Sequence, residues 1–473
     1  MDNTTIAAIA TPVGSGGIGV IRISGDLAGD IALRLFRKGD KTHGNCHQPA
    51  TAPPATLDSH KLYYGFIIDP SASVIVDEVL LVKMVAPKSY TREDVVEIQS
   101  HCGPVVLRKI LSLVLASGAR LAEPGEFTRR AFLNGRLDLS QAEAVADIIN
   151  AKTDLTLAFA TEQLKGALTQ TITSIADRLT FWLARIEAQI EFTDDIDLES
   201  TEDINDIADR LDSETIEPIK DLLISVKQGA AIRDGINICV VGRPNVGKSS
   251  LLNRLLDSDR AIVADSPGTT RDIIREYFSI CGIPFYISDM AGIHPTNDPV
   301  ESIGIRKAHE AILASDLILL MVDITDPKLP ENVDILNIIH GKKAILVYNK
   351  MDLRAGGKRI EIGNEQDYSG VVHISALSGE GIADLKNTIE DVSLSQCFIT
   401  PGKTIVPNIR HRDCLEKARL SIQQGIEGIH AGNNLDIIAL DLESGLQALT
   451  EVLGSHTSID VLDNIFSRFC IGK

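Results

Sequence analysis

Short apolar stretches broken by polar residues begin the chain, and long stretches with helical spacing follow them. The first pattern predicts an α+β unit with one helix at residues 105–115 and strands at residues 18–23, 74–85 and 94–99. From Ser140 onward, apolar residues recur every three or four positions, which predicts amphipathic helices. The same spacing returns at residues 410–426, 434–453 and 458–469. Helices on both sides of a central segment would most simply pack together as one bundle.

Two local features refine this helical part. Ser140 followed by Glu143 matches a capping box, which predicts that the first helix begins there. Residues 191–221 carry thirteen acids against only Arg210 and Lys220, so we expect a solvated acidic connector.

A phosphate-binding loop is predicted between the two helical parts. The apolar run at residues 236–241 ends at Gly242, and GRPNVGKS then leads into a helical pattern, which fits G-x-x-x-x-G-K-[ST]. Backbone N–H groups of such a loop converge on phosphate oxygens. Lys248 would reach the β- and γ-phosphates, and the Ser249 hydroxyl would hold Mg²⁺. The alternative is a plain turn before a core helix.

Motifs downstream of the loop indicate guanine as the base. Asn349, Lys350 and Asp352 follow a strand-like run, and Ser375 and Ala376 follow another. The Asp352 carboxylate can accept two hydrogen bonds from guanine, whereas adenine offers no donors on that edge. We therefore expect a GTPase domain.

Metal and γ-phosphate contacts complete this domain. Asp289 would hold Mg²⁺ through water, Gly292 would sense the γ-phosphate, and Thr270 would complete the metal shell. The residues expected to contact GTP are Asn245, Val246, Gly247, Lys248, Ser249, Ser250, Thr269, Thr270, Asp289, Gly292, Asn349, Lys350, Asp352, Ser375 and Ala376.

The residue that positions the attacking water is not where Ras-type enzymes have it. Ile293 follows the DMAG motif and cannot orient water, so Glu301 is the candidate. The alternative role of Glu301 is a first-turn acid favoured by the helix dipole.

Composition and charge limit the possible functions. The net charge is −19 and the pI about 5.0, which argues against a general nucleic-acid binder but leaves room for a local basic patch. Seven scattered cysteines without a C-x-x-C pair indicate a reducing compartment. With no basic segment at the N-terminus, no secretory signal is evident, so we expect a cytoplasmic protein.

The sequence resembles the tRNA wobble-uridine modification GTPases, the MnmE or TrmE family. The likeness rests on TPVGSGGIGVIRISG, EDVVEIQSHCGP, PGEFTRRAFLNGRLDLSQAEAVADII, the GTPase motifs and the terminal FCIGK. The GTPase motifs occur in many translational GTPases, whereas PGEFTRRAFLN and the terminal CIGK are far more specific.

This resemblance implies a multidomain α/β protein. Its parts would be an α+β folate-binding and dimerisation domain (residues 1–135), a helical domain in two parts (136–234 and 397–473), and a Ras-like P-loop GTPase domain (235–396) inserted between them.

The resemblance also implies the folate residues and the metal ions. A 5,10-methylene- or 5-formyl-tetrahydrofolate would contact Arg22, Glu97, Arg136 and Lys473, and Cys470 would face the reaction. From the residues alone, Arg22 and Glu97 are solvated strand positions and Cys470 is a small buried hydrophobe. Catalysis is expected from Glu301, Lys248 and Cys470, Mg²⁺ at Ser249 and Thr270, and K⁺ at Asn245, Ala264, Ser266 and Thr269.

Three residues depart from the family pattern within the GTPase segment. They are Met290, Ala264 and His294, and they bear on the rate of hydrolysis rather than on the choice of nucleotide. Arg136 stands where the family often has lysine, which keeps the charge but changes its geometry.

The implied function is K⁺-stimulated GTP hydrolysis by a homodimer that acts on tRNA. With a flavin-bearing partner (MnmG, or GidA), the family adds a (carboxymethyl)aminomethyl-type group at C5 of wobble uridine 34.

The main alternative is a ribosome-assembly GTPase switch, which would carry an RNA-binding domain after the GTPase segment. Residues 425–428 fit a GXXG loop, but the sequence around them indicates a helix. A third alternative, a scaffold GTPase at membranes, lacks a basic amphipathic helix or a lipidation signal.

Overall fold

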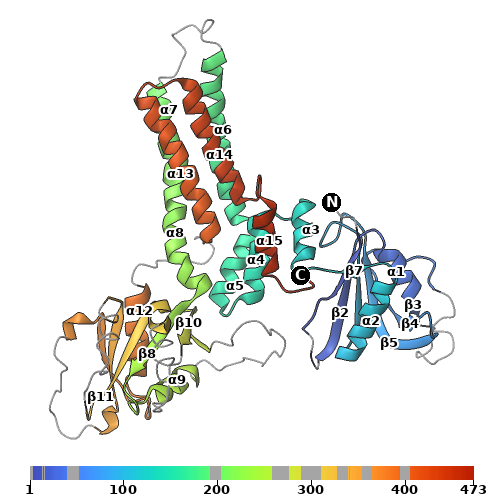
Figure 1. Cartoon of the computed structure of the whole chain (residues 1–473), viewed down its shortest axis with the longest axis horizontal. Coiled ribbons are helices and arrows are strands. Elements are labelled where there is room, and N and C mark those ends of the chain that lie inside the picture. Colours follow the sequence, from blue (N-terminus) through green and yellow to red (C-terminus); the bar gives the residue numbers. More distant parts are fainter. Residues whose placement is uncertain are drawn as a thin grey trace, which may run out of the picture.

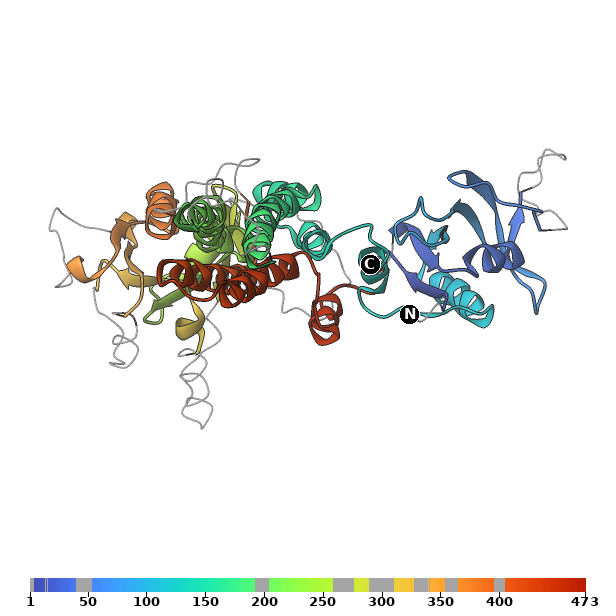
Figure 2. The same ribbon diagram turned by 90° about the horizontal axis from the view of Figure 1, so that it is seen from above.

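The computed structural model describes residues 4–12, 14, 16–39, 53–191, 204–257, 276–288, 310–326, 339, 341–353, 365–394 and 405–473. A mostly antiparallel N-terminal sheet lies on one side of the molecule, and a long helical bundle and a second, mostly parallel sheet lie together on the other (Figures 1 and 2). The multidomain α/β architecture expected from the sequence is confirmed. No helix in the described part of the chain is long and apolar enough to span a bilayer.

The N-terminal sheet has the strand order β3-β4-β5-β6-β2-β1-β7. Its strands are β1 (Ile6–Ile9), β2 (Gly16–Ser24), β3 (Phe36–Lys38), β4 (Leu62–Asp69), β5 (Val74–Met84), β6 (Val95–Cys102) and β7 (Arg120–Leu121). Helices α1 (Ala28–Leu35) and α2 (Pro104–Ala116) pack on the face that carries Ile21 and Ile23. Because side chains alternate along a strand, Arg22 lies on the opposite face.

On that opposite face, Arg22 is the register partner of Glu97 on β6. The face also contacts Phe127 of the short helix α3 (Glu126–Leu133), which packs against Ile6 and Ala8. Charged residues therefore line a partly covered face of the sheet rather than a freely solvated one.

One apolar core joins the helices that flank the central segment. Its members come from α6 (Ala167–Glu191), α7 (Ile204–Leu211), α8 (Glu217–Asp234), α13 (Ile409–His430) and α14 (Leu435–Val452). The predicted single bundle is thus confirmed. Below it lie α4 (Leu139–Asn150), α5 (Asp154–Leu164) and α15 (Ile459–Ser467) (Figure 1).

Two local expectations about the helices were wrong. The N-cap of α4 is Asp138, which forms a capping box with Gln141, while Ser140 lies inside the helix. The acidic stretch is not a solvated connector over residues 204–221, because it forms α7, a π-helical turn (Asp212–Ile216) and the start of α8. Ile207, Leu211 and Ile216 are fully buried in the bundle, and the acids occupy the other face.

The second sheet has the order β13-β12-β11-β8-β10-β9, and all its pairs are parallel except β10 with β9. Its strands are β8 (Ile236–Gly242), β9 (Tyr277–Ile280), β10 (Ile283–Ser288), β11 (Leu317–Asp323), β12 (Ala344–Asn349) and β13 (Gly370–His373). Helices α9 (Lys248–Asp257) and α12 (Ile382–Leu394) pack on the sheet through the core that holds β8 and β10. Parallel strands bring their carboxyl ends to one edge, where this class of sheet binds ligands.

A buried charge network lies where the bundle meets this sheet. The Arg410 guanidinium donates to both oxygens of Glu143 at 2.9 Å, and His411 Nε2 lies 2.8 Å from Glu143 Oε2. The backbone N–H of Asn408 donates to His411 Nδ1, so we infer that a neutral His411 carries its proton on Nε2. Burial lowers the pKa of His411, against the attraction of Glu143. Burial alone would raise the pKa of Glu143, but His411 and Arg410 lower it to about 2.

Asp147 lies one helical turn beyond Glu143 on α4. Burial raises the pKa of Asp147 to about 6, and Arg233 opposes the shift only in part. A carboxyl group with a raised pKa binds more protons in the folded state, so its ionisation destabilises the fold as pH rises through about 6.

We predict that Asp147→Asn stabilises the protein at pH 7.5 by about 1–2 kcal/mol, because an amide has no ionisation penalty. The difference from wild type should shrink as the pH falls toward 4. The single tryptophan, Trp182, lies in the bundle core, so its fluorescence during thermal unfolding reports on this part. Asp177→Asn, on the exposed face of α6, is the matched control. A stabilisation that does not change with pH would contradict the assignment.

Candidate functional site

The loop after β8 joins the central strand of the parallel sheet to the helix α9. Gly247 adopts φ +99°, and a Cβ there would lie 2.2 Å from Asn349 Nδ2, so only glycine fits this position. The ammonium group of Lys248 donates to the carbonyl oxygens of Gly242 and Arg243, at 2.8 and 2.9 Å. Lys248, Ser249 and Ser250 form the first turn of α9, whose N-terminus points into the loop.

Asn349 connects this loop to the residues predicted to recognise the base. It is almost fully buried, and its amide donates to the carbonyl of Val246 at 2.7 Å. Its side-chain oxygen accepts from the backbone N–H of Ala376 at 2.9 Å. The Ser375 hydroxyl donates to Asp352 Oδ1 at 2.5 Å, so it orients the carboxylate. Residues that follow three different strands thus meet at one edge of the sheet.

Asp323 is a member of this site that the sequence reasoning missed. It ends β11, and its carboxylate lies 2.6 Å from the ammonium group of Lys350. Lys350 itself has φ +69°, a rare conformation for a residue with a side chain. The available signal was an acid directly after the buried run at residues 317–322, at the register position that Asn349 has on β12.

Several expected site residues lie outside the described part of the chain. These are Thr269, Thr270, Asp289, Gly292, Ala264, Ser266 and Glu301, together with the family departures Met290 and His294.

A second cluster lies on the N-terminal sheet around Arg22. Its guanidinium donates to Glu97 at 2.9 Å and to the carbonyl oxygen of Gly472 at 3.2 Å. It also lies 5.6 Å from the ring centre of Tyr90 and 5.7 Å from that of Phe127, within range of cation–π attraction. The Arg22 and Glu97 side chains are only about a fifth exposed, which rules out the simple solvated positions that the residues alone suggested.

The C-terminal tail, residues 470–473, reaches this cluster. Gly472 has φ +95°, and a Cβ there would lie 2.5 Å from the carbonyl oxygen of Ile9, so the tail packs closely on β1. The carbonyl oxygen of Cys470 accepts from the N–H groups of Gly125 and Lys473. Cys470 itself is exposed, so it is not a buried hydrophobe. The tail therefore brings Cys470 and Lys473 to the face that carries Arg22 and Glu97.

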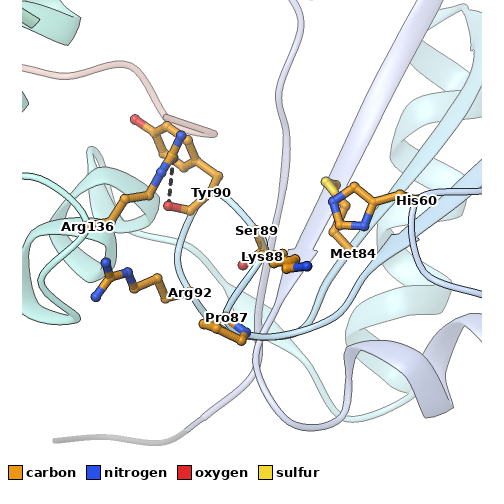
Figure 3. A pocket seen from close by; sticks show the side chains of 8 residues that line it. All are labelled: His60, Met84, Pro87, Lys88, Ser89, Tyr90, Arg92 and Arg136. Atoms are coloured by element: carbon orange, nitrogen blue, oxygen red, sulfur yellow. Dashed lines mark hydrogen bonds between the residues drawn. The ribbon is translucent and has the colours of Figure 1, made fainter. Parts of the chain in front are cut away.

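Arg136 lies beside the same cluster. Its guanidinium lies 4.6 Å from the ring centre of Tyr90 and donates to the Tyr90 carbonyl oxygen at 2.8 Å (Figure 3). Arg136 and Tyr90 both line an open cavity of about 580 Å³, whose other lining residues are His60, Met84, Pro87, Lys88, Ser89 and Arg92. Tyr90 thus lies between Arg136 and Arg22, and Arg22 in turn contacts Glu97 and the tail.

The sheet order, the loop before α9 and the base-side residues define a P-loop GTPase. Two family models match the chain, "GTP-binding protein TrmE N-terminus" at residues 5–136 and "MnmE helical domain" at residues 139–470. The chain therefore belongs to the MnmE family.

Several named proteins are similar to this chain over nearly the full length of both sequences. The tRNA modification GTPases MnmE of Geobacter sulfurreducens, Acetivibrio thermocellus and Geobacillus kaustophilus are 44%, 43% and 41% identical to the chain. Each comparison covers 99% of this chain and 99% of the relative.

We predict that Asp352→Asn changes the preferred base from guanine to xanthine. The amide can no longer accept both guanine N–H groups, so GTP affinity should fall by about 100-fold, the loss of two hydrogen bonds to a charged acceptor. The same amide can donate to the C2 oxygen of xanthine, so XTP should bind better than GTP. Binding of fluorescent GTP and XTP analogues tests this, with Asp384→Asn on the exposed first turn of α12 as the control. Unchanged GTP affinity would remove Asp352 from the base site.

Proposed function

We propose that this chain is a K⁺-stimulated GTPase that uses GTP and a folate to modify C5 of wobble uridine 34 in tRNA, in the cytoplasm. The observation that carries the proposal is the meeting of the C-terminal tail with Arg22 and Glu97 in a chain that also holds a GTPase site. A GTPase that only switches between two states has no need of a second polar cluster on a separate sheet.

The residues of the GTPase site suit GTP and Mg²⁺. Gly247 has no side chain, which leaves room for phosphate oxygens beside its backbone. The ammonium group of Lys248 now donates to two carbonyl oxygens, and it can donate to the charged oxygens of a phosphate in their place. Ser249 and Thr270 would hold Mg²⁺, which neutralises charge on the phosphates when bound. Asn349, Lys350, Asp352, Ser375 and Ala376 would select guanine.

Potassium would occupy a position beside the phosphate loop. Asn245 has φ +64°, which turns the loop backbone at the residue assigned to K⁺. The other expected ligands are Ala264, Ser266 and Thr269. A monovalent cation there would take the place of an arginine finger and balance negative charge that develops on the phosphates.

We predict that Glu301→Ala retains GTP affinity but lowers kcat by about 100-fold or more, because a positioned base contributes that much to water attack. Replacing K⁺ by Na⁺ should lower kcat of the wild-type protein without changing GTP affinity. Phosphate release and nucleotide binding are measured separately. Loss of binding in Glu301→Ala would show that Glu301 is structural.

The residues around Arg22 suit a folate. Glu97 can accept from the amino and N–H groups of a pterin, Arg22 can donate to its carbonyl oxygen, and the rings of Tyr90 and Phe127 offer stacking surfaces. Arg136 and Lys473 provide positive charge for the acidic end of the molecule. The folate, as a 5,10-methylene or 5-formyl derivative, would supply the one-carbon unit. The exposed thiol of Cys470 would lie beside the folate and take part in the reaction.

Assembly forms part of the proposal. The N-terminal domain (residues 1–135) would form a homodimer, and the two GTPase domains (235–396) would meet across their nucleotide faces during hydrolysis. The helical domain (136–234 and 397–473) would relay that movement. A flavin-bearing partner (MnmG/GidA) and tRNA would complete the reaction, which adds a (carboxymethyl)aminomethyl-type group.

The ribosome-assembly alternative finds little support in the region that follows the GTPase segment. Gly425 and Gly428 of the GXXG pattern are buried within helix α13. A Cβ at Gly425 would lie 2.9 Å from Leu442, so this glycine lets α13 and α14 approach each other. The pattern serves helix packing and does not form an RNA-binding loop.

We predict that cells without this gene lose C5-substituted wobble uridines. A wild-type copy should restore them, and a Lys248→Ala copy should not, because it lacks the phosphate-binding ammonium group. Nucleoside mass spectrometry of bulk tRNA measures this. Unchanged tRNA together with accumulated ribosomal precursors would favour the assembly switch and set the folate site aside.

A further inference from the structure

The open cavity beside Tyr90 has an unusual charge. Lys88, Arg92 and Arg136 contribute three cations to its lining, His60 adds a titratable ring, and no acid lines it. All four side chains are exposed. In a chain with a net charge of −19, such a concentration of positive charge indicates an anionic ligand.

None of the three cations forms an ion pair with a carboxylate of the described residues. Arg92 donates to the backbone oxygen of Asn134 at 3.0 Å, and Arg136 donates to that of Tyr90. The acids nearest in sequence are engaged elsewhere, since Glu93 binds Arg130 and Asp94 binds Lys83. The positive charge of the cavity is therefore available to a ligand.

The cavity also has the size and the walls of a small-molecule site. Its volume of about 580 Å³ is within the usual range for ligand pockets. Met84, Pro87 and Tyr90 provide apolar surface between the cations (Figure 3). Arg92 has φ +60°, a strained conformation that is common at binding sites.

Tyr90 and Arg136 connect the cavity to the proposed folate residues. Arg22 lies over the ring of Tyr90, and Arg136 contacts both that ring and its backbone. A folate is a pterin joined through p-aminobenzoate to glutamate, and further glutamates can be added through γ-linkages. Each added residue brings one more carboxylate, so the chain is an extended polyanion with apolar methylene groups.

We propose that this cavity binds the oligo-γ-glutamate tail of the folate, with Lys88 and Arg92 contacting carboxylates beyond the first glutamate. The inference rests on the proposed folate site. RNA phosphates are the other anion to consider, but they would require a basic stripe along a surface, and this charge lies in one concavity with apolar walls.

The test uses the full-length protein and two probes, 5-formyl-tetrahydrofolate with one glutamate and with three γ-linked glutamates. Calorimetry at low ionic strength should show that the triglutamate binds about tenfold more tightly, the effect of one charge-assisted hydrogen bond. Added salt should reduce this preference, because exposed charges are screened.

Variants of the cavity residues test whether the cavity causes the tighter binding of the triglutamate. In Lys88→Gln, and more so in Lys88→Gln/Arg92→Gln, the ratio of the two affinities should fall toward one. Arg108→Gln removes the same charge from an exposed position on α2 outside the cavity, and it should keep the wild-type ratio. Circular dichroism and retained binding of the monoglutamate verify that each variant is folded.

The possible failures are distinguishable. If the monoglutamate binds and the triglutamate binds equally well, the tail inference is overturned and the folate site stands. If neither compound binds, the folate site itself fails. If the variants weaken binding of labelled tRNA while the glutamate ratio stays unchanged, the cations serve RNA and the tail inference is again overturned.

Discussion

The buried carboxylate of Glu143 joins the helical residues that precede the GTPase segment to those that follow it. Its partners, Arg410 and His411, follow it by more than 260 residues in sequence. An unpaired buried carboxylate costs several kcal/mol, and loss of one partner of such a pair typically costs about 3–5 kcal/mol. Arg410 also donates to the carbonyl oxygens of Glu451 and Val452, so one guanidinium connects α4 and α13 with the end of α14. The bundle is therefore complete only after the chain has returned from the parallel sheet.

The N-terminal site depends on this closure. Beyond α14, Phe466 of α15 packs with Leu139 and Ala142 of α4 and with Phe132 of α3. Gly125 has φ +68°, and a Cβ there would lie 2.6 Å from the carbonyl oxygen of Phe466. The tail then runs to β1 and meets Arg22. The C-terminus thus lies beside the first sheet (Figure 2), and the polar cluster there joins Arg22 of β2 with Gly472 of the tail.

The parallel sheet is connected to the bundle in a similar way. Helix α8 leads directly into β8, and Thr156 of α5 donates to the carbonyl oxygen of Ile232 near the end of α8. Val406, where the chain returns, packs closely on Gly229 of α8. Movement of the GTPase sheet would therefore act first on α8 and α5, the elements that border Asp147 and Arg233. Helix α5 packs on α4, and α4 packs on α15, so α8, α5, α4 and α15 connect the parallel sheet with the N-terminal cluster.

The sequence by itself indicated β2, β5 and β6 of the first sheet, β8, β12 and β13 of the second, and the phosphate loop, because each depends on residues close together in the chain. The residues predicted to contact guanine come from the same kind of local motif. The sequence also indicated the amphipathic helices and their common bundle. The spacing of Ile207, Leu211 and Ile216 is typical of the buried face of a helix. The many acids around these residues favoured a solvated connector instead. Only the tertiary structure decided that Asp138 rather than Ser140 caps α4, that Glu143 pairs with Arg410, and that loops far apart in sequence form one cationic cavity. Local backbone preferences act over a few residues, whereas pairings over hundreds of residues depend on the path that the whole chain takes.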